Sequence, residues 1–543
     1  MAFPPTLSPL LTSNEPPSHL DTTHLIEVTA SLSAAIEDAL EKVKRLQAER
    51  DKCRIVLSPT RRIPQEILSE ILSLLPLIPG NEEAPADLVV ISLVCRAWRE
   101  AAITTHSLWQ GLIFNPCACR KPYNDRSPFH QAEYKQAQIW LSRSGALPKS
   151  ICLERNPDGA RCGCDDPRKR CESTHPTVVK MLTEGPPIDE FTLHVSSTRC
   201  FRKWTAAIAS HADGFAGRGT RWAQLRSFVL VFHEEDDQLW DDSTDPKQSI
   251  FVDLPPVIEF HLNLPSPERA FEEDEDSKTR SLHIPMSFLN RLKVFVIRWE
   301  WGGSKLSELL EHCINLESFT LDLYESEVFD ETNDPVTDAL RISPITLVNL
   351  KEIHIRRGNI HILEVLNTPH LDTLDVEFSV PMTQTWSAIK RVGKFITASK
   401  IESTLRTLRM CELLSAHNTV YLPLPVLPAL RHLVLDSREV TGYHFGIEGH
   451  LDDRSKKHPQ FPQLAHFEVL NLQRSSITLQ HEVSFLQRRR TGVPCMVTAS
   501  YRDEVVCPEA TLQTRLLSGK DVFLRVVQND EYEDSRAWYV QKD

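Results

Sequence analysis

The residues best suited to chemistry in this sequence are cysteines, which gather with one histidine in the region 117–175. They are Cys117, Cys119, Cys152, Cys162, Cys164, Cys171 and His175. Thiolates and imidazoles bind zinc, usually four at a time in a tetrahedron. Two of the pairs are Cys-x-Cys, however, whereas a metal-binding hairpin commonly places at least two residues between its cysteines. We therefore predict reduced thiols in a charged loop and no metal site, and keep a zinc-binding regulatory protein as a third hypothesis.

No other residue pattern predicts an active site. The histidines between 444 and 466 share a region with several aspartates, but no HExxH or comparable spacing links them. The glycine-rich segment 214–219 lacks the Lys-Ser/Thr pair and the preceding strand of a phosphate-binding loop. The sequence contains no G-x-S-x-G element and no RING-like cysteine series. We predict a non-enzymatic protein with no catalytic residues and no cofactor.

Composition limits the partners and the compartment. The 543 residues carry 61 Lys and Arg against 74 Asp and Glu, a net charge of −13, which disfavours general nucleic-acid binding. No apolar run approaches the roughly 18 residues of a membrane span, and the N-terminus has no basic region followed by an apolar one. Thirteen cysteines without a secretory signal favour free thiols in a reducing compartment, cytoplasmic and/or nuclear.

The N-terminal region divides into a tail and a helix. Residues 1–19 are rich in Pro, Ser and Thr and are predicted to be disordered. Residues 20–57 are predicted to form an amphipathic helix, because from 24 to 57 apolar residues recur at steps close to 3.6 with no Pro or Gly. Such a helix must pack on something. Coiled-coil pairing with a second copy, which would make a homodimer through helix 24–57, and docking on the next domain both stay open.

Two further helical segments follow. Pro64 stands where the first of them begins, and apolar residues recur through Ile-Pro-Gln-Glu-Ile-Leu-Ser-Glu-Ile-Leu from Ile63 onward. After a linker at 76–87 comes a second helical stretch, Leu88–Ala102, which contains Ser-Leu-Val-Cys-Arg-Ala-Trp-Arg, and then a Leu-Trp pair that ends at Trp109.

These ordered segments resemble the F-box, over residues 58–114. Ile63 replaces the usual Leu before the first Pro, and the linker is longer than in compact members. The preceding helix and the Trp-Leu-Ser-Arg-Ser-Gly-Ala-Leu-Pro segment from Trp140 are similar to F-box proteins abundant in mushroom-forming fungi. The resemblance implies docking on the Skp adaptor and, through it, on a cullin.

The resemblance also implies which residues meet the adaptor. Some would form a small core and others an exposed apolar contact, the usual mark of an interaction surface. The residues are Pro64, Ile67, Leu68, Ile71, Leu93, Val94, Cys95, Trp98 and Trp109. The alternative is that the leucines and the two tryptophans only fill an intramolecular core.

A recurrent segment marks the second half of the chain. It is apolar at its first, fourth and sixth positions and ends in the alternation of a half-buried strand. Copies begin at Ile188, Leu225, Leu292, Leu316, Leu350, Leu371, Leu405, Leu430 and Leu464. Helical stretches separate several copies, which is typical of a leucine-rich-repeat-like solenoid with a parallel sheet. The family's Asn or Cys after the strand is missing, and an ordinary α/β domain is the alternative.

The predicted fold is thus α+β or α/β: an amphipathic helix and a small helical F-box, followed by an irregular leucine-rich-repeat-like α/β solenoid. The boundaries are a Cys-containing connector at 115–180, the solenoid at 181–475 with an acidic insertion at about 233–280, and a C-terminal cap at 476–543. The predicted function is the substrate-recognition subunit of a Skp–cullin–F-box ubiquitin ligase, whose repeats bind a protein target of unknown identity. The alternative from another class is a non-catalytic scaffold without a ligase role.

Overall fold

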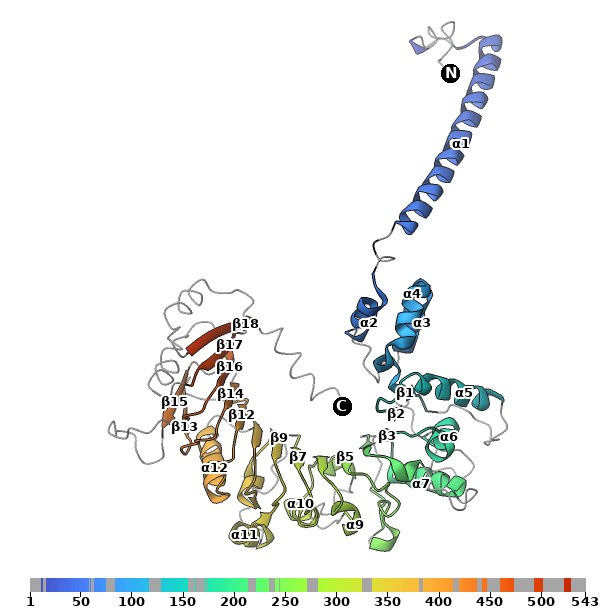
Figure 1. The fold of residues 1–543 in the computed structure, drawn as a ribbon. Helices are drawn as coiled ribbons and strands as arrows, with labels where there is room; N and C mark the ends of the chain where they lie inside the picture. The colour runs from blue at the N-terminus through green and yellow to red at the C-terminus, as the bar shows by residue number, and fades with distance from the viewer. Residues whose placement is uncertain are drawn as a thin grey trace. The chain divides into compact units, whose positions relative to one another are not determined.

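The computed structural model describes most of the chain in two compact units. The described residues are 11–12, 16–57, 59, 63–74, 84–116, 128–154, 162, 171, 173–212, 221–233, 240–243, 245–270, 282–324, 335–379, 384–413, 419–436, 442–446, 460–472, 493–501 and 522–528. The first unit holds the N-terminal helices, and the second holds a large sheet from Trp109 onward (Figure 1). None of the described helices is long and apolar enough to cross a membrane.

The first unit begins with one long helix. Helix α1 spans His19–Val56, and the Ser18 side chain caps it by accepting a hydrogen bond from the Asp21 N–H. A helix therefore forms where one was predicted at 20–57, and each of its ends lies one residue earlier, while its amphipathic character and coiled-coil pairing stay predictions. None of its residues is buried. The predicted disordered tail at 1–19 lies mostly outside the described residues.

Three shorter helices complete the first unit. They are α2 (Gln65–Ser73), α3 (Ala84–Val94) and α4 (Arg96–Thr104). Pro64 immediately precedes α2 in an extended conformation, in keeping with a helix start at that proline. A short 3-10 turn, η3 (His106–Trp109), then leads into the sheet of the second unit.

The second unit is built on one 14-stranded sheet in which every neighbouring pair is parallel. Its strands lie side by side in chain order, so each strand pairs with the sheet strand before it and the sheet strand after it in the sequence. The strands are β1 (Gly111–Phe114), β2 (Ser150–Leu153), β3 (Glu190–Val195), β4 (Ser227–Phe232), β5 (Glu259–Asn263), β6 (Val294–Arg298), β7 (Ser318–Asp322), β9 (Glu352–Gly358), β11 (Thr373–Phe378), β12 (Thr407–Cys411), β14 (His432–Asp436), β16 (His466–Leu472), β17 (Cys495–Tyr501) and β18 (Val522–Gln528).

Helices and two small parallel pairs occupy the connections. The helices are α5 (Pro128–Ser142), α6 (Pro176–Glu184), α7 (Thr198–Ala212), α8 (Pro267–Ala270), α9 (Met286–Leu289), α10 (Gly303–Leu310), α11 (Pro335–Ile342) and α12 (Thr385–Ala398). The small pairs join β8 (Ile345–Thr346) to β10 (Leu366–Asn367) and β13 (Thr419–Pro423) to β15 (Gly442–Gly446). The large parallel sheet is thus established, while its reading as a leucine-rich-repeat-like solenoid stays a prediction.

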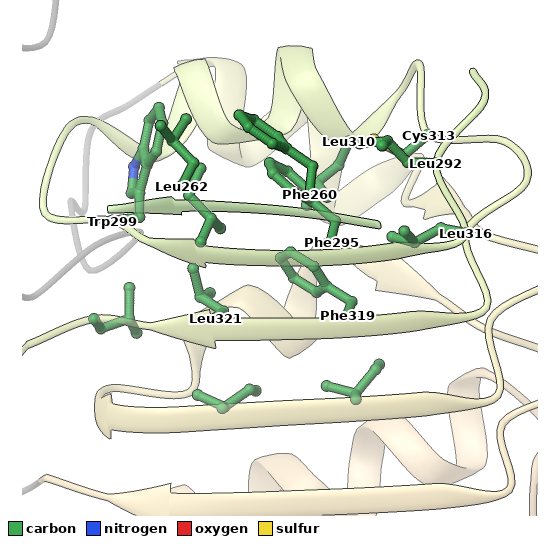
Figure 2. Packing of buried hydrophobic residues seen from close by; sticks show 14 of the residues in the cluster. Phe260, Leu262, Leu292, Phe295, Trp299, Leu310, Cys313, Leu316, Phe319 and Leu321 are labelled. Carbon is green, nitrogen blue, oxygen red and sulfur yellow. The ribbon is translucent and has the colours of Figure 1, made fainter. Parts of the chain in front are cut away.

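The recurrent apolar positions form the core of this unit. In the copy that begins at Leu292, the side chains of Leu292, Phe295 and Ile297 are completely buried. Phe295 also stacks on rings of both neighbouring strands, with centroids 6.1 Å from Phe260 of β5 and 6.1 Å from Phe319 of β7 (Figure 2). These parallel strands pair in register. The core residue of each strand therefore lies against the equivalent residue of the next strand.

Charged residues alternate along the edge where the strands begin. Just before four successive strands stand Lys293, Glu317, Lys351 and Asp372, and Arg406 precedes the fifth. Each of the first four accepts, at its carbonyl, two backbone N–H groups from the next strand, as Lys293 does from Glu317 (2.7 Å) and Ser318 (2.9 Å). The Glu317 carboxylate accepts hydrogen bonds from the ammonium groups of Lys293 and Lys351, which lowers its pKa to about 2. Opposite charges on neighbouring strands favour this register.

Several expectations need correction. Strand β5 lies inside the predicted acidic insertion at about 233–280, so part of that segment belongs to the sheet. Strand β2 and helices α5 and α6 likewise occupy the predicted connector at 115–180. In the predicted cap at 476–543, the described residues include β17 and β18, which continue the large sheet.

Candidate protein-interaction surface

Helix α2 presents two apolar stripes, of which one is buried and the other exposed. Leu68 and Leu72 are fully buried, whereas Ile67 and Ile71 are 52% and 41% exposed. Residues four apart share one face of a helix, so each pair forms a continuous stripe. A nine-residue helix needs one apolar stripe to pack on its neighbours. The second stripe is left free for a partner.

Helix α3 repeats this division. Leu88 is 2% exposed, while Val90, Leu93 and Val94 are 64%, 68% and 58% exposed. The exposed residues stand three and four positions apart, so they share one face of the helix. Val89 is also exposed, at 56%. Exposed aliphatic side chains in this density are typical of interaction surfaces.

Helix α4 holds the other two helices together. Both α2 and α3 pack on α4, where Ala101 and Ala102 are completely buried and their small side chains allow close approach. Gln65 Nε2 donates to Thr104 Oγ1 at 3.3 Å, and Arg99 Nε donates to the Ser92 carbonyl at 3.0 Å. The first bond links the first turn of α2 to the end of α4, and the second links α3 to the start of α4.

The predicted single helix over Leu88–Ala102 is two helices. Cys95 has φ −164° and ψ 176°, an extended conformation that ends α3 and precedes the first residue of α4. Cys95 and Trp98 are half-buried in this arrangement, and Pro64 is exposed. The break lets the two segments pack on each other, because a continuous helix could not fold back on itself.

Trp109 belongs to the core of the second unit and is not an exposed contact. It is 3% exposed, its ring lies edge-on to Trp140 with centroids 4.6 Å apart, and the Arg143 guanidinium lies 4.4 Å from its ring centroid. Trp140 Nε1 also donates to the Gly111 carbonyl of β1 at 3.0 Å. Of the residues assigned to the adaptor by resemblance, Trp109 and Leu68 therefore stabilise the fold, and Ile67, Ile71, Leu93 and Val94 are available to a partner.

The candidate surface also includes residues that the sequence analysis did not name. These are Leu74, 76% exposed at the end of α2, together with Val89 and Val90 of α3. Their spacing from Ile67, Ile71 and Leu93 could have identified them, since each lies three or four residues from one of that set. We define the docking face as Ile67, Ile71, Leu74, Val90, Leu93 and Val94.

Comparison with known families identifies the domain to which these helices belong. A family model described as F-box-like matches residues 60–115, the span of α2, α3, α4, η3 and β1. No curated protein matches the chain. The chain thus carries an F-box-like domain, which supports an F-box protein, and F-box domains generally bind Skp-type adaptors.

A group of charged side chains lies on the face of the sheet opposite its apolar core and was missed from the sequence. The Asp375 carboxylate on β11 accepts from Arg356 Nη2 at 2.8 Å, and its Oδ2 lies 3.4 Å from His354 Nδ1 and 3.9 Å from Arg409 Nη1. Its side chain is 5% exposed. Burial by itself raises the pKa of Asp375, but the hydrogen bond with His354 and the two arginines outweigh burial and lower it.

His354 shows the complementary shift. Burial lowers its pKa, but hydrogen bonds with Asp375 and Glu352 outweigh burial and raise it. Asp375 therefore stabilises the fold above the ordinary aspartate pKa of about 3.9, and this contribution is lost as pH falls through its folded pKa. His354 stabilises the fold below the ordinary histidine pKa of about 6.5, and this contribution is lost as pH rises through its folded pKa.

Replacing Asp375 by Asn should destabilise the second unit by about 3 kcal/mol, because Arg356 and His354 are largely buried and keep only the more exposed Glu377 and Glu352 as anions, at 3.8 and 3.9 Å. Thermal unfolding measured from about pH 5 to about pH 9 checks this, because that range spans the histidine pKa. The parent should lose stability as pH rises above about 6.5, and the variant should lose less over that range. Asp372→Asn is the control, because its ion pair with Arg406 is exposed. Equal melting temperatures for parent and Asp375→Asn would contradict the prediction.

Proposed function

We propose that this protein is a substrate-recognition subunit of a Skp–cullin–F-box ubiquitin ligase. One observation carries the proposal: the docking face exposes Ile67, Ile71, Leu93 and Val94 within the segment that matches the F-box-like family. Burying such a side chain in an interface favours binding by at most about 1.5–3 kcal/mol, from which the cost of association is subtracted. A helical domain with no partner would gain nothing from leaving them in water.

The proposed mechanism is tethering without catalysis. The F-box holds the adaptor and cullin, and the sheet unit holds a protein target, so target lysines reach a high effective concentration beside the ubiquitin-conjugating enzyme. The chain itself would supply no reacting group. The proposal places the protein in the cytoplasm and/or nucleus, where its free thiols and its ligase partners would be found.

We further propose that the sheet unit works as a leucine-rich-repeat-like solenoid whose exposed strand and loop residues recognise the target. In-register parallel strands in chain order, most of them with buried apolar core positions, support this reading. The resemblance to proteins of mushroom-forming fungi rests on the sequence segments alone.

A scaffold that dimerises through α1 is the second candidate. It is favoured by the apolar side chains that α1 leaves exposed, such as Ile36 (58% exposed), Val43 (48%) and Leu46 (54%). No residue of α1 is buried against another part of the chain. A dimeric scaffold would need no docking face on α2 and α3.

The deciding experiment is capture of a purified Skp-type adaptor by the full-length chain, with molar mass measured by light scattering in the same runs. A one-to-one complex with the adaptor supports the ligase subunit. A well-folded dimeric chain that retains no adaptor would overturn it and leave the scaffold as the better assignment.

A further inference from the structure

Three buried cysteines converge in the second unit at a place that the proposed function does not use. Cys162, Cys171 and Cys200 are 6%, 2% and 0% exposed, and their sulfur atoms all lie within 4.8 Å of one another. They come from different segments: Cys171 precedes α6, and Cys200 lies in the first turn of α7. Convergence of thiols from separate segments is the arrangement from which metal sites are built.

One sulfur–sulfur distance matches that between two thiolates bound to the same metal ion. Cys162 Sγ and Cys171 Sγ are 3.8 Å apart. With metal–sulfur bonds of about 2.3 Å, sulfurs at the corners of a tetrahedron lie about 3.8 Å apart, and those of a flat triangle about 4.0 Å. A disulfide would need about 2.05 Å. The thiols are therefore placed for a shared ligand without a large rearrangement.

The surroundings of Cys200 favour a thiolate. The Ser197 hydroxyl donates to Cys200 Sγ at 3.4 Å and accepts from the Cys200 N–H at 3.3 Å. Cys200 also lies at the N-terminal end of a 15-residue helix, whose dipole favours negative charge. Thiolates are the form of cysteine that binds metals.

The burial of Cys162 and Cys171 is not explained by the residues between them. Both lie in the main apolar core, although residues 163–170 read GCDDPRKR and carry no large apolar side chain. Burial of two small side chains gives modest stabilisation, whereas a structural zinc ion contributes folding free energy outright.

We propose that Cys162, Cys171 and Cys200 form a structural zinc site that links Cys162 and Cys171 to the start of α7. Zinc is the thiophilic ion that three sulfurs and one further ligand suit best. This revises the expectation of unliganded thiols from the sequence. The assignment is independent of adaptor binding, because no residue of the docking face takes part.

The test is the zinc content of the full-length chain, purified under reducing conditions from zinc-supplemented cells without a metal-affinity tag. About one zinc per chain is expected in the parent, and less than about 0.1 in Cys171→Ser, since loss of one ligand weakens a structural site severely. Cys313→Ser is the matched control. Cys313 is fully buried and donates to the Leu309 carbonyl at 3.3 Å, outside the cluster, and its replacement should leave the zinc content unchanged.

Cobalt substitution keeps the test decisive if Cys171→Ser folds poorly. Cobalt-loaded parent and Cys313→Ser should both show a strong sulfur-to-cobalt charge-transfer band, and Cys162→Ser and Cys200→Ser should each lose most of it. Parent protein with less than about a tenth of a zinc per chain would overturn the site. So would zinc retained in all three cluster variants, or a Cys162–Cys171 disulfide found by mass spectrometry after reducing purification.

Discussion

Aspartate at both Ile67 and Leu93 should weaken capture of a Skp-type adaptor by the full-length chain by about a hundredfold or more. The two side chains are 52% and 68% exposed in the free protein, so docking would bury an unpaired charge at each position. The same exposure predicts that the folded protein tolerates both changes. The measurement is adaptor affinity by biolayer interferometry, with the thermal unfolding curve of each variant recorded beside it.

The control for this pair is Ile36→Asp with Leu46→Asp on α1. These side chains are 58% and 54% exposed, so the control makes the same chemical change at equal exposure outside the docking face. Adaptor affinity should stay at the parent value. Undiminished binding by the Ile67→Asp/Leu93→Asp variant would show that the docking face is not the adaptor contact. Loss of binding in both double variants would point to a general effect of added charge.

Truncating Phe295 to Ala should cost the second unit about 3–5 kcal/mol of unfolding free energy. Phe295 is completely buried between Phe260 and Phe319, with ring centroids 6.1 Å from each, so its removal opens a cavity and breaks a row of aromatic contacts (Figure 2). The neighbouring strands pair in register around it, which limits how far the site can collapse.

The matched control is Val296→Ala on the same strand. Val296 is half-buried and points to the opposite face, so its truncation should cost under about 1 kcal/mol. Urea denaturation followed by tryptophan fluorescence measures both variants. A Phe295→Ala midpoint no lower than that of Val296→Ala would mean that the aromatic row does not hold the sheet together.

Local patterns predicted much of this architecture. The steps of Leu25, Val28, Leu32 and Ile36 indicate a helix, and α1 forms there. The apolar positions of the recurrent segment predicted which strand residues are buried, because a strand alternates its side chains between two faces whatever it packs against. Leu316, Phe319 and Leu321 illustrate this, at 1%, 0% and 0% exposure.

Features that depend on contacts distant in sequence were not predicted. Val257, Phe260 and Leu262 of the β5 region are buried like the other copies, yet the acidic runs around them hid the strand. The Asp375 cluster joins three strands, and no local motif reveals that burial and three cations meet at one carboxylate.

The sequence by itself determined the F-box-like motif and the buried positions of the recurrent strands that it identified, because helix and strand periodicity are local properties of the chain. Only the tertiary structure decided which apolar residues of the F-box-like segment remain free. It placed Leu68 and Trp109 inside and left Ile67 and Leu93 outside, although all four are equally apolar in sequence. It also brought Cys162 and Cys171 beside Cys200. Burial and convergence depend on the packing of neighbouring elements, and a single sequence does not encode these locally.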